Sequence, residues 1–253
     1  MPPQEKAVTT RAAAGIGEIV LNRPSKRNAL DTAMCVELRQ AAERLGADGS
    51  VKVVVVRGAG PAFCAGADRE ERQGMSADDV RARRLKAFAA YDALENLAVP
   101  AIAMVHGAVV GSGGEIAAAC DFIVASDDAT FRYPEAVLGT VGATQRLPRR
   151  IGLSRAKELL FTGRALSASE AASWGLVNRV VPASELEAAV MAMARQIADA
   201  PAAAIRLTKR SLEHGVRLER SAALAAEVLA IEELLEGSGS TAAMAPKAPD
   251  ETR

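Results

Sequence analysis

Glu115 and Glu135 differ in their surroundings from the other acidic residues of the chain. Glu115 lies one turn into an otherwise apolar segment, residues 116–120, and Glu135 follows a short predicted strand, in a loop. Two carboxylates can act as general base and general acid where a fold brings them together. The alternative for Glu115 is a structural role, in which its charge complements the dipole at the beginning of a helix. Composition alone does not pair the two side chains, so both interpretations stay open.

A glycine-rich turn, Gly111–Glu115, joins a predicted buried strand to a predicted helix. Unpaired backbone N–H groups at such a helix start can hold an anion or a developing oxyanion. Alternatively, the glycines only permit close packing of strand and helix. Known nucleotide-binding motifs do not fit, because no third glycine follows Gly113 at the required spacing and no glycine precedes a lysine with serine or threonine.

A second turn of small residues, Phe63–Asp68, follows a predicted strand over residues 51–56. Asp68 can cap a helix that starts there. Taken alone, the segment is a packed turn or a binding site. Two such turns after two parallel strands can converge at the carboxyl ends of those strands, where α/β folds bind ligands. The sequence shows no histidine that would pair with Cys64, so Cys64 is not expected to act as a nucleophile. His106 is interpreted as a structural histidine at a strand end.

The elements that carry these turns alternate between strand and helix. A hairpin is predicted around Gly15, and Asp31 is predicted to cap a helix over residues 32–45. The strand, helix and strand that end at residue 56 predict a βαβ unit, and an α/β core follows from the same recurrence further along. Beyond residue 153 the pattern is mostly helical, over 154–162, 168–174, 184–198, 202–214 and 218–235.

Composition excludes several classes of protein. The 253 residues fit one large domain or a domain with an appendage, and 31 basic side chains balance 31 acidic ones. With a pI near 6.8 and 3% aromatic residues, the chain lacks the basic patch and stacking rings of a nucleic-acid binder. The longest uncharged stretch, 96–114, is interrupted by proline and glycines, which argues against a membrane span.

The cysteines and the N-terminus indicate the setting of the protein. Three cysteines without short spacing and two histidines form no recognisable metal motif, so we expect no bound metal and a reducing environment. The first eleven residues contain charges and no apolar run, which predicts that a signal peptide is absent. A cytoplasmic location is therefore expected.

Taken together, the motifs resemble the enoyl-CoA hydratase/isomerase family, also called the crotonase superfamily. The resemblance implies an α/β fold, a crotonase-like spiral of ββα units with a C-terminal helical trimerisation region. It implies a spiral core over residues 1–195 and a helical region over 196–253 that ends in a flexible tail. The motifs that carry it are Ile19–Pro24, Asn28–Leu30, Phe63–Asp68, His106–Gly107, Gly111–Glu115, Cys120–Asp121, Pro134–Glu135, Leu138–Gly139, Thr144–Leu147, Thr162–Gly163, Ala171–Ala172 and Gly175–Asn178.

The activity that the resemblance implies is hydration, in which water adds across the 2,3 double bond of a trans-2-enoyl-CoA thioester. It assigns the oxyanion hole to the backbone N–H groups of Ala67 and Ser112, which would stabilise the enolate oxygen. It assigns Glu115 as the base toward water and Glu135 as the donor to the α-carbon. Family isomerases commonly keep only the second glutamate, so the pair favours hydration. The alternatives are a double-bond isomerase, a decarboxylase, a specialised hydratase or a non-catalytic acyl-CoA binder.

The resemblance also implies how substrate and partners are held. The substrate is an acyl-CoA, and no separate cofactor is expected because coenzyme A is part of it. The resemblance implies that copies of the chain assemble into a homotrimer or a dimer of trimers. The implied substrate-binding residues are Lys26, Arg27, Ala29, Ala65, Gly66, Ala67, Asp68 and Gly111.

Two departures from the family pattern stand out. Residues 139–144 form a loop about three residues shorter than in family hydratases, and that loop helps to wall the pocket for the acyl group and water. Residues 243–247 replace the C-terminal run that lies near the adenine in the family. The short loop favours an unusual substrate or reaction, and the tail is not expected to contact adenine.

Overall fold

The computed structural model describes residues 6–238. Within it the chain forms two compact units, of which the first ends at Asp199 and the second begins at Ala200. The division into a core over 1–195 and a helical region over 196–253 stays a prediction. The expected flexible tail and the unusual run 243–247 lie outside the described residues, apart from the end of the last helix.

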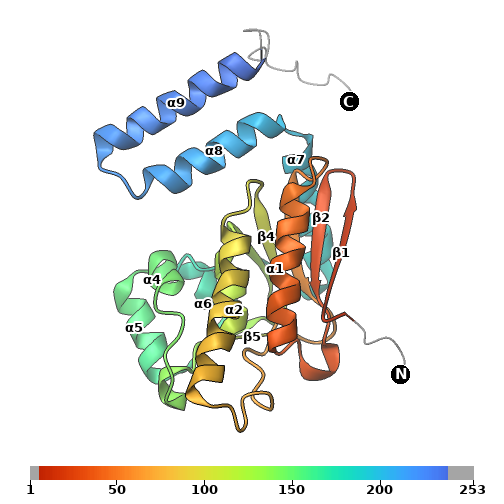
Figure 1. Ribbon diagram of the computed structural model, residues 1–253, viewed down its shortest axis with the longest axis vertical. Coiled ribbons are helices and arrows are strands. Elements are labelled where there is room, and N and C mark those ends of the chain that lie inside the picture. Colours follow the sequence, from red (N-terminus) through yellow and green to blue (C-terminus); the bar gives the residue numbers. More distant parts are fainter. Residues whose placement is uncertain (1–5, 239–253) are drawn as a thin grey trace. The chain divides into compact units, whose positions relative to one another are not determined.

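A six-stranded sheet forms the centre of the first unit (Figure 1). The hairpin β1 (Val8–Ala13) and β2 (Ile16–Leu21) is antiparallel, as predicted around Gly15. Strands β3 (Val53–Gly58), β4 (Ala101–Val105), β6 (Phe122–Ser126) and β9 (Arg179–Val181) then follow in parallel, in the order β1-β2-β3-β4-β6-β9. Strand β2, helix α1 (Thr32–Ala47) and strand β3 make the predicted βαβ unit.

Alternation along the strands divides the core between the two faces of this sheet. In β3, Val54 and Val56 belong to the larger apolar cluster, which includes side chains of α1 and α2 (Ala77–Glu95). Val53 and Val55 point the other way, into the cluster formed with α7 (Leu186–Asp199). Because both faces are covered, the strand reads as an uninterrupted apolar run.

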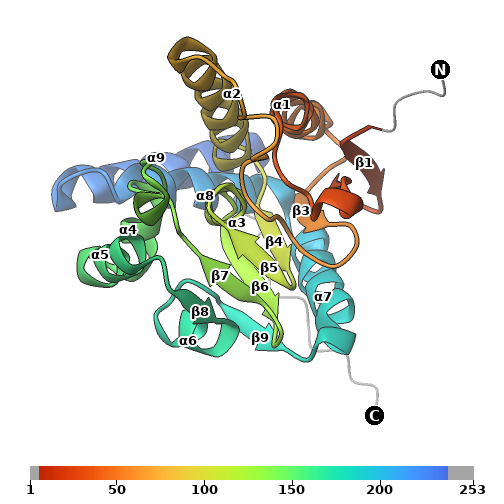
Figure 2. The same cartoon turned by 90° about the horizontal axis from the view of Figure 1, so that it is seen from below.

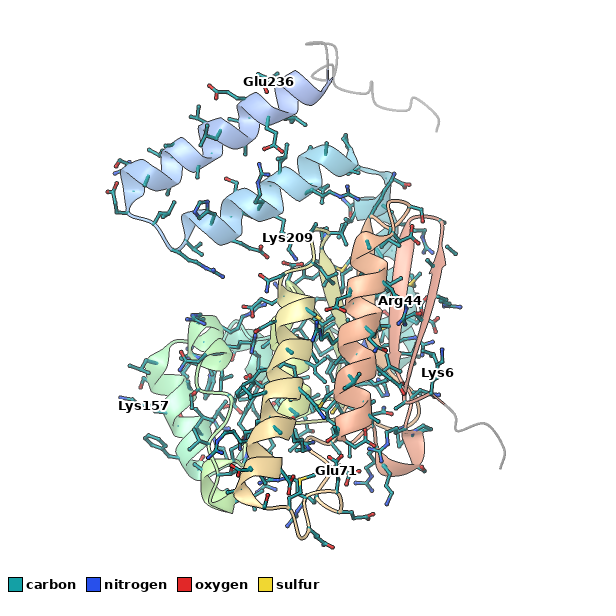
Figure 3. All side chains as sticks on the ribbon, viewed as in Figure 1. Lys6, Arg44, Glu71, Lys157, Lys209 and Glu236 are labelled. Atoms are coloured by element: carbon teal, nitrogen blue, oxygen red, sulfur yellow. The ribbon has the colours of Figure 1, made fainter. Side chains whose placement is uncertain are left out.

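Helices α1 and α2 lie side by side over one face of the sheet, as Figure 2 shows. Asp31 caps α1 as predicted, since its carboxylate accepts a hydrogen bond from the N–H of Met34 at 2.7 Å. Glu71, labelled in Figure 3, contacts both the beginning of α1 and the N-terminal half of α2. Its carboxylate accepts the N–H of Thr32 at 2.8 Å and pairs with Arg83 of α2 at 2.7 Å.

The helix expected to start at Asp68 is wrong. Residues 69–74 form turns, and α2 begins only at Ala77. Asp68 does accept the N–H groups of Glu70 at 3.0 Å and Glu71 at 3.3 Å, and its other oxygen pairs with Arg23. The turns end at Gly74, whose φ of +78° is not helical. The stronger start lies downstream, where Ser76 and Asp79 form a reciprocal capping box.

A small three-stranded sheet supports the other end of the candidate site. Strand β5 (Ala108–Val110) pairs in parallel with β7 (Thr130–Arg132), which pairs antiparallel with β8 (Ala165–Ser167). Helix α3 (Ser112–Ala119) follows β5 after Gly111 alone. Two short 3-10 turns, Pro24–Lys26 and Ala136–Leu138, and helices α4 (Arg146–Ile151), α5 (Leu153–Thr162) and α6 (Ala168–Ser173) complete this part of the unit, with a third 3-10 turn at Ala183–Glu185.

The second unit contains α8 (Ala202–Gly215) and α9 (Arg220–Ser238), which pack against each other. Both helices begin and end within two or three residues of the predicted bounds. Several apolar side chains of α9 face solvent in the single chain, among them Leu224, Val228 and Leu229. Within the described part of the chain, no helix is both long and apolar enough to span a bilayer.

Candidate active site

The two turns singled out in the sequence meet in the structure. Cys64 pairs with the small sheet, because its N–H donates to Ala108 at 3.1 Å and its carbonyl accepts from Val110 at 2.9 Å. The first turn of α3 then packs directly on Cys64. A Cβ built on Gly113 would lie 2.4 Å from the Cys64 carbonyl oxygen, so only glycine permits this approach. The glycines thus have the packing role, and that packing brings the two turns together.

Two backbone N–H groups reach one pocket from these turns. Ala67 and Ser112 both line it, together with Glu115 and Glu135. The N–H of Ser112 is one of the unpaired donors at the beginning of α3, where the first helical bond is made by Glu115 to Gly111. Among residues 6–238, neither the Ala67 nor the Ser112 N–H donates to a protein acceptor. Two donors are therefore available to a ligand in the pocket.

Glu115 is buried and Glu135 half-buried at this pocket, and the two come from different elements. Glu115 is in the first turn of α3, and Glu135 follows β7 at the start of a 3-10 turn. Glu115 Oε1 and Glu135 Oε2 are both buried and accept no hydrogen bond from the described residues. Buried polar atoms are nearly always bonded, so such atoms in a pocket mark a site that receives a ligand or water.

Glu115 is held by a single ion pair. Its Oε2 lies 3.3 Å from Nη1 of Arg146, and both side chains are about nine-tenths buried. Burial raises the pKa of Glu115, the Arg146 charge opposes that rise, and the negative charge of Glu135 adds to it. Burial is the largest of these causes. Glu115 is therefore a carboxylate whose affinity for a proton is increased, as a general base needs.

Glu135 lacks a comparable partner. Burial raises its pKa, and the Arg84 charge on α2 opposes this only from a distance, since no ion pair joins the two side chains in the described structure. Glycines make room for its side chain: a Cβ on Gly111 would lie 2.4 Å from Glu135 Oε1, and one on Gly142 2.8 Å from its Cγ. Gly111 therefore contributes space to the site.

Arg146 is a site residue for which the sequence predicts no role. Besides Glu115, its guanidinium contacts Asp92 at 2.8 Å and Glu95 at 2.6 Å on α2, and it lies 5.6 Å from the ring of Tyr91. Three carboxylates and a ring face fix its position. The available signal was its presence in the motif Thr144–Leu147, which gives no hint of a partner 31 residues away.

The segment expected to cradle coenzyme A, residues 26–29, lies beside the turn Phe63–Asp68 and does not line the pocket. Ala65 donates to the carbonyl of Arg27 at 2.9 Å, and Leu30 donates to that of Gly66 at 2.7 Å. Lys26 pairs on the surface with Glu70 at 2.6 Å, and the carbonyl of Ala29 accepts from Arg23. This segment, with Ala65, Gly66 and Asp68, thus borders the turn that carries Ala67.

Cys64 is unsuited to nucleophilic catalysis in this setting. It is fully buried, and burial raises the pKa of its thiol to about 12. The thiolate, which is the reactive form, is therefore not populated near neutral pH. His106 bonds the carbonyl of Gly60 at 2.8 Å, in agreement with a structural role. Within residues 6–238, no cluster of three or more possible metal ligands is found.

The short loop forms part of the pocket wall. Thr140, Val141, Gly142 and Ala143 line the pocket opposite residues of α2. Arg84 of α2 donates to the carbonyl of Val141 and to the hydroxyl of Thr140, which anchors the loop. The cavity measures about 70 Å³, far smaller than typical ligand pockets.

Comparison with known proteins agrees with this geometry. The family model described as "Enoyl-CoA hydratase/isomerase" matches residues 11–244. The chain belongs to the enoyl-CoA hydratase/isomerase family. A relative from Arabidopsis thaliana named probable enoyl-CoA hydratase 2, mitochondrial, is 38% identical over 226 residues, 88% of this chain and 75% of that protein.

Solved structures of family members confirm the fold. An enoyl-CoA hydratase from Bacillus anthracis superposes with a TM-score of 0.88 at 36% identity and covers 91% of each chain. A Thermobifida fusca protein solved in complex with acetoacetyl-CoA has a TM-score of 0.84 at 31% identity, over 92% of this chain and 96% of that one. The expected crotonase fold with C-terminal helices is therefore confirmed, and the chain is an enzyme of the acyl-CoA hydratase/isomerase type.

Proposed function

We propose that the protein is an enoyl-CoA hydratase that adds water to a trans-2-enoyl-CoA and forms the 3-hydroxyacyl-CoA. One observation carries the proposal: two carboxylates, each with a buried oxygen that accepts no hydrogen bond from the described residues, share a pocket with two backbone N–H groups that donate to none of them. Hydration needs these two kinds of group, carboxylates to move protons and donors to hold the oxyanion.

The reaction follows from the placement of these groups. Glu115 accepts a proton from water while the water oxygen bonds to the β-carbon of the substrate. The electron pair of the double bond moves toward the thioester, and the enolate oxygen receives hydrogen bonds from the N–H groups of Ala67 and Ser112. Glu135 then gives its proton to the α-carbon. The donors act most strongly on the charge that develops in the transition state, which is why they accelerate the reaction.

The environments of the two carboxylates support this division of roles. Glu115 contacts a guanidinium, which favours its charged form, whereas Glu135 has no ion pair and favours its neutral form. Pairs of titratable groups whose environments differ in this way serve as base and acid. No separate cofactor and no metal enters the proposed steps, and residues 26–29 and 65–68 are proposed to border the coenzyme A portion.

The direct test is incubation of the purified protein with crotonyl-CoA and with longer and branched enoyl-CoAs. Hydration removes the absorbance of the conjugated enoyl thioester and adds the mass of one water to the product. Isomerisation leaves the mass unchanged, and decarboxylation removes carbon dioxide. Unchanged absorbance and mass across the panel, with tight acyl-CoA binding, would show a non-catalytic binder and contradict the proposal.

Replacing Arg146 by glutamine is expected to move the acid limb of the pH profile of kcat/KM to higher pH. The reason is that a base works only when ionised, and the Arg146 charge lowers the pKa of Glu115, so its removal raises that pKa further. Displacement of the carboxylate is expected to lower kcat up to about 10²-fold as well.

Two variants check that result. Arg146→Lys keeps the charge and is expected to leave the acid limb closer to its original position. Arg39→Gln removes an exposed arginine of α1 that pairs only with Glu43 and is expected to change nothing. An unmoved acid limb in Arg146→Gln would mean that Arg146 does not control the ionisation of Glu115.

We also propose that copies of the chain assemble into a trimer or a dimer of trimers. Helix α9 supports this, because Leu224, Val228, Leu229 and Ile231 are exposed in the single chain, and exposed apolar patches of this kind mark interfaces. Light scattering at micromolar concentration is expected to give a trimer or hexamer mass. Leu229→Glu is expected to lower that mass, and Leu153→Glu, at a similarly exposed leucine of α5, is not. A monomer mass for the unaltered chain would contradict the assembly.

A further inference from the structure

The α2 wall of the pocket is positively charged. Helix α2 contributes Val80, Arg83, Arg84, Ala87, Phe88 and Tyr91, and the preceding loop adds Arg72. A pocket for a simple hydrocarbon chain is lined predominantly by apolar side chains. Apolar side chains dominate this lining too, but an aliphatic acyl group offers no partner to the arginines that lie among them.

The three arginines differ in how their charge is balanced. Arg83 is buried and neutralised, since it pairs with Glu71 at 2.7 Å and donates to the carbonyl of Leu30. Arg84 donates only to neutral acceptors, the Val141 carbonyl and the Thr140 hydroxyl. In the described part of the chain no carboxylate lies within ion-pair distance of Arg84 or Arg72, although both side chains are half-buried. Two cations at the pocket thus have no ion-pair partner among the described residues.

Arg84 is the better placed of the two. Its two bonds fix the guanidinium against the short loop that walls the pocket, and its charge acts on Glu135. The thioester oxygen is assigned to Ala67 and Ser112, and the glutamates to the α- and β-carbons. Arg84 and the loop residues 140–143 line the same pocket as these groups, so an acyl group held there has Arg84 within its surroundings. A guanidinium has five N–H donors, more than these two acceptors use.

We propose that the acyl group of the substrate is short and ends in a carboxylate, which Arg84 binds. The proposal rests on the proposed function, because it takes the positions of the thioester and of the β-carbon from it. A carboxylate at this point would complete the ion balance of the wall through charge-assisted hydrogen bonds, which are about twice as strong as neutral ones. The cavity of about 70 Å³ fits a short acyl group better than a long chain.

The test measures binding, so that it does not depend on turnover. The dissociation constants of pentanedioyl-CoA and 5-methylhexanoyl-CoA are compared by calorimetry, because an isopropyl group replaces the carboxylate in the second thioester. The unaltered protein is expected to bind the first at least tenfold more tightly. Arg84→Gln is expected to lower that ratio at least tenfold, and Arg84→Lys is expected to keep part of it. Arg81→Gln, at an exposed arginine of α2 paired with Asp78, is expected to keep all of it.

Two results would overturn the proposal. One is equal binding of the two thioesters by the unaltered protein. The other is an Arg84→Gln variant that loses both affinities by the same factor, which would show that Arg84 only anchors the loop. Turnover of trans-pent-2-enedioyl-CoA against 5-methylhex-2-enoyl-CoA separates this proposal from the proposed function. If both thioesters are hydrated at equal kcat/KM, the protein is a hydratase but Arg84 does not select a carboxylate. If the protein binds pentanedioyl-CoA selectively but hydrates neither enoyl thioester, Arg84 binds the carboxylate and the proposed hydratase function is wrong.

Discussion

Replacing Glu115 by glutamine is expected to lower kcat/KM for hydration of crotonyl-CoA by about 10²–10⁴-fold. Glutamine keeps the size of the side chain and can still accept from Arg146, but it cannot take a proton from water. The binding of a saturated acyl-CoA is expected to change little, because the oxyanion donors come from Ala67 and Ser112 of the main chain. Initial rates and calorimetric titrations measure the two effects separately.

The same substitution is not expected to reduce stability. The pKa of Glu115 is raised in the folded protein, so folding favours the protonated form, and the ionised carboxylate destabilises the fold above its unfolded pKa. The glutamine removes that cost, so Tm at neutral pH is expected to stay or rise. Glu43→Gln, at an exposed residue of α1, serves as the control for both measurements. Full activity in Glu115→Gln would remove Glu115 from the proposed mechanism.

Replacing Gly113 by alanine is expected to lower kcat/KM by about 10²–10³-fold. The added Cβ would lie 2.4 Å from the Cys64 carbonyl oxygen and 2.9 Å from the Cys64 Cβ, so the two turns must move apart. Their separation displaces the N–H groups of Ala67 and Ser112 relative to each other, and a preorganised pair of donors is lost. Overpacking of this kind also costs about 1–3 kcal/mol of stability.

Kinetics and thermal unfolding together test this prediction. Gly49→Ala is the matched control, because the Cβ added there meets no atom within 4 Å. It is expected to retain activity and Tm. A Gly113→Ala protein with lowered Tm but full kcat/KM would show that contact between the turns does not position the donors. That outcome would contradict the assignment of the oxyanion hole.

Local sequence signals predicted those elements whose boundaries depend on neighbouring residues. The cap at Asp31, the hairpin at Gly15 and the buried valines of β3 are all local, and the structure confirms each of them. Helix α2 was missed, although Ser76 and Asp79 spell out a capping box. The arginines and alanines of α2 give no clear row of large apolar residues at helical spacing, so the hydrophobic periodicity does not predict this helix. The expected helix after Asp68 was wrong although Asp68 accepts the N–H groups of Glu70 and Glu71 as a cap would. The segment stays a set of turns that ends at Gly74, whose φ of +78° is not helical.

Short stretches of the chain specify which groups are available to the site. They supply the two glutamates, the two turns with small residues and the order of motifs typical of the family, because each of these resides in a few consecutive residues. The environment of each glutamate is a matter of tertiary structure. Arg146 reaches Glu115 across 31 residues, and Arg84 reaches the loop after Glu135 across 56 and 57. Only packing of α2 against α3 and this loop decides those distances, and charge interactions depend on distance and burial.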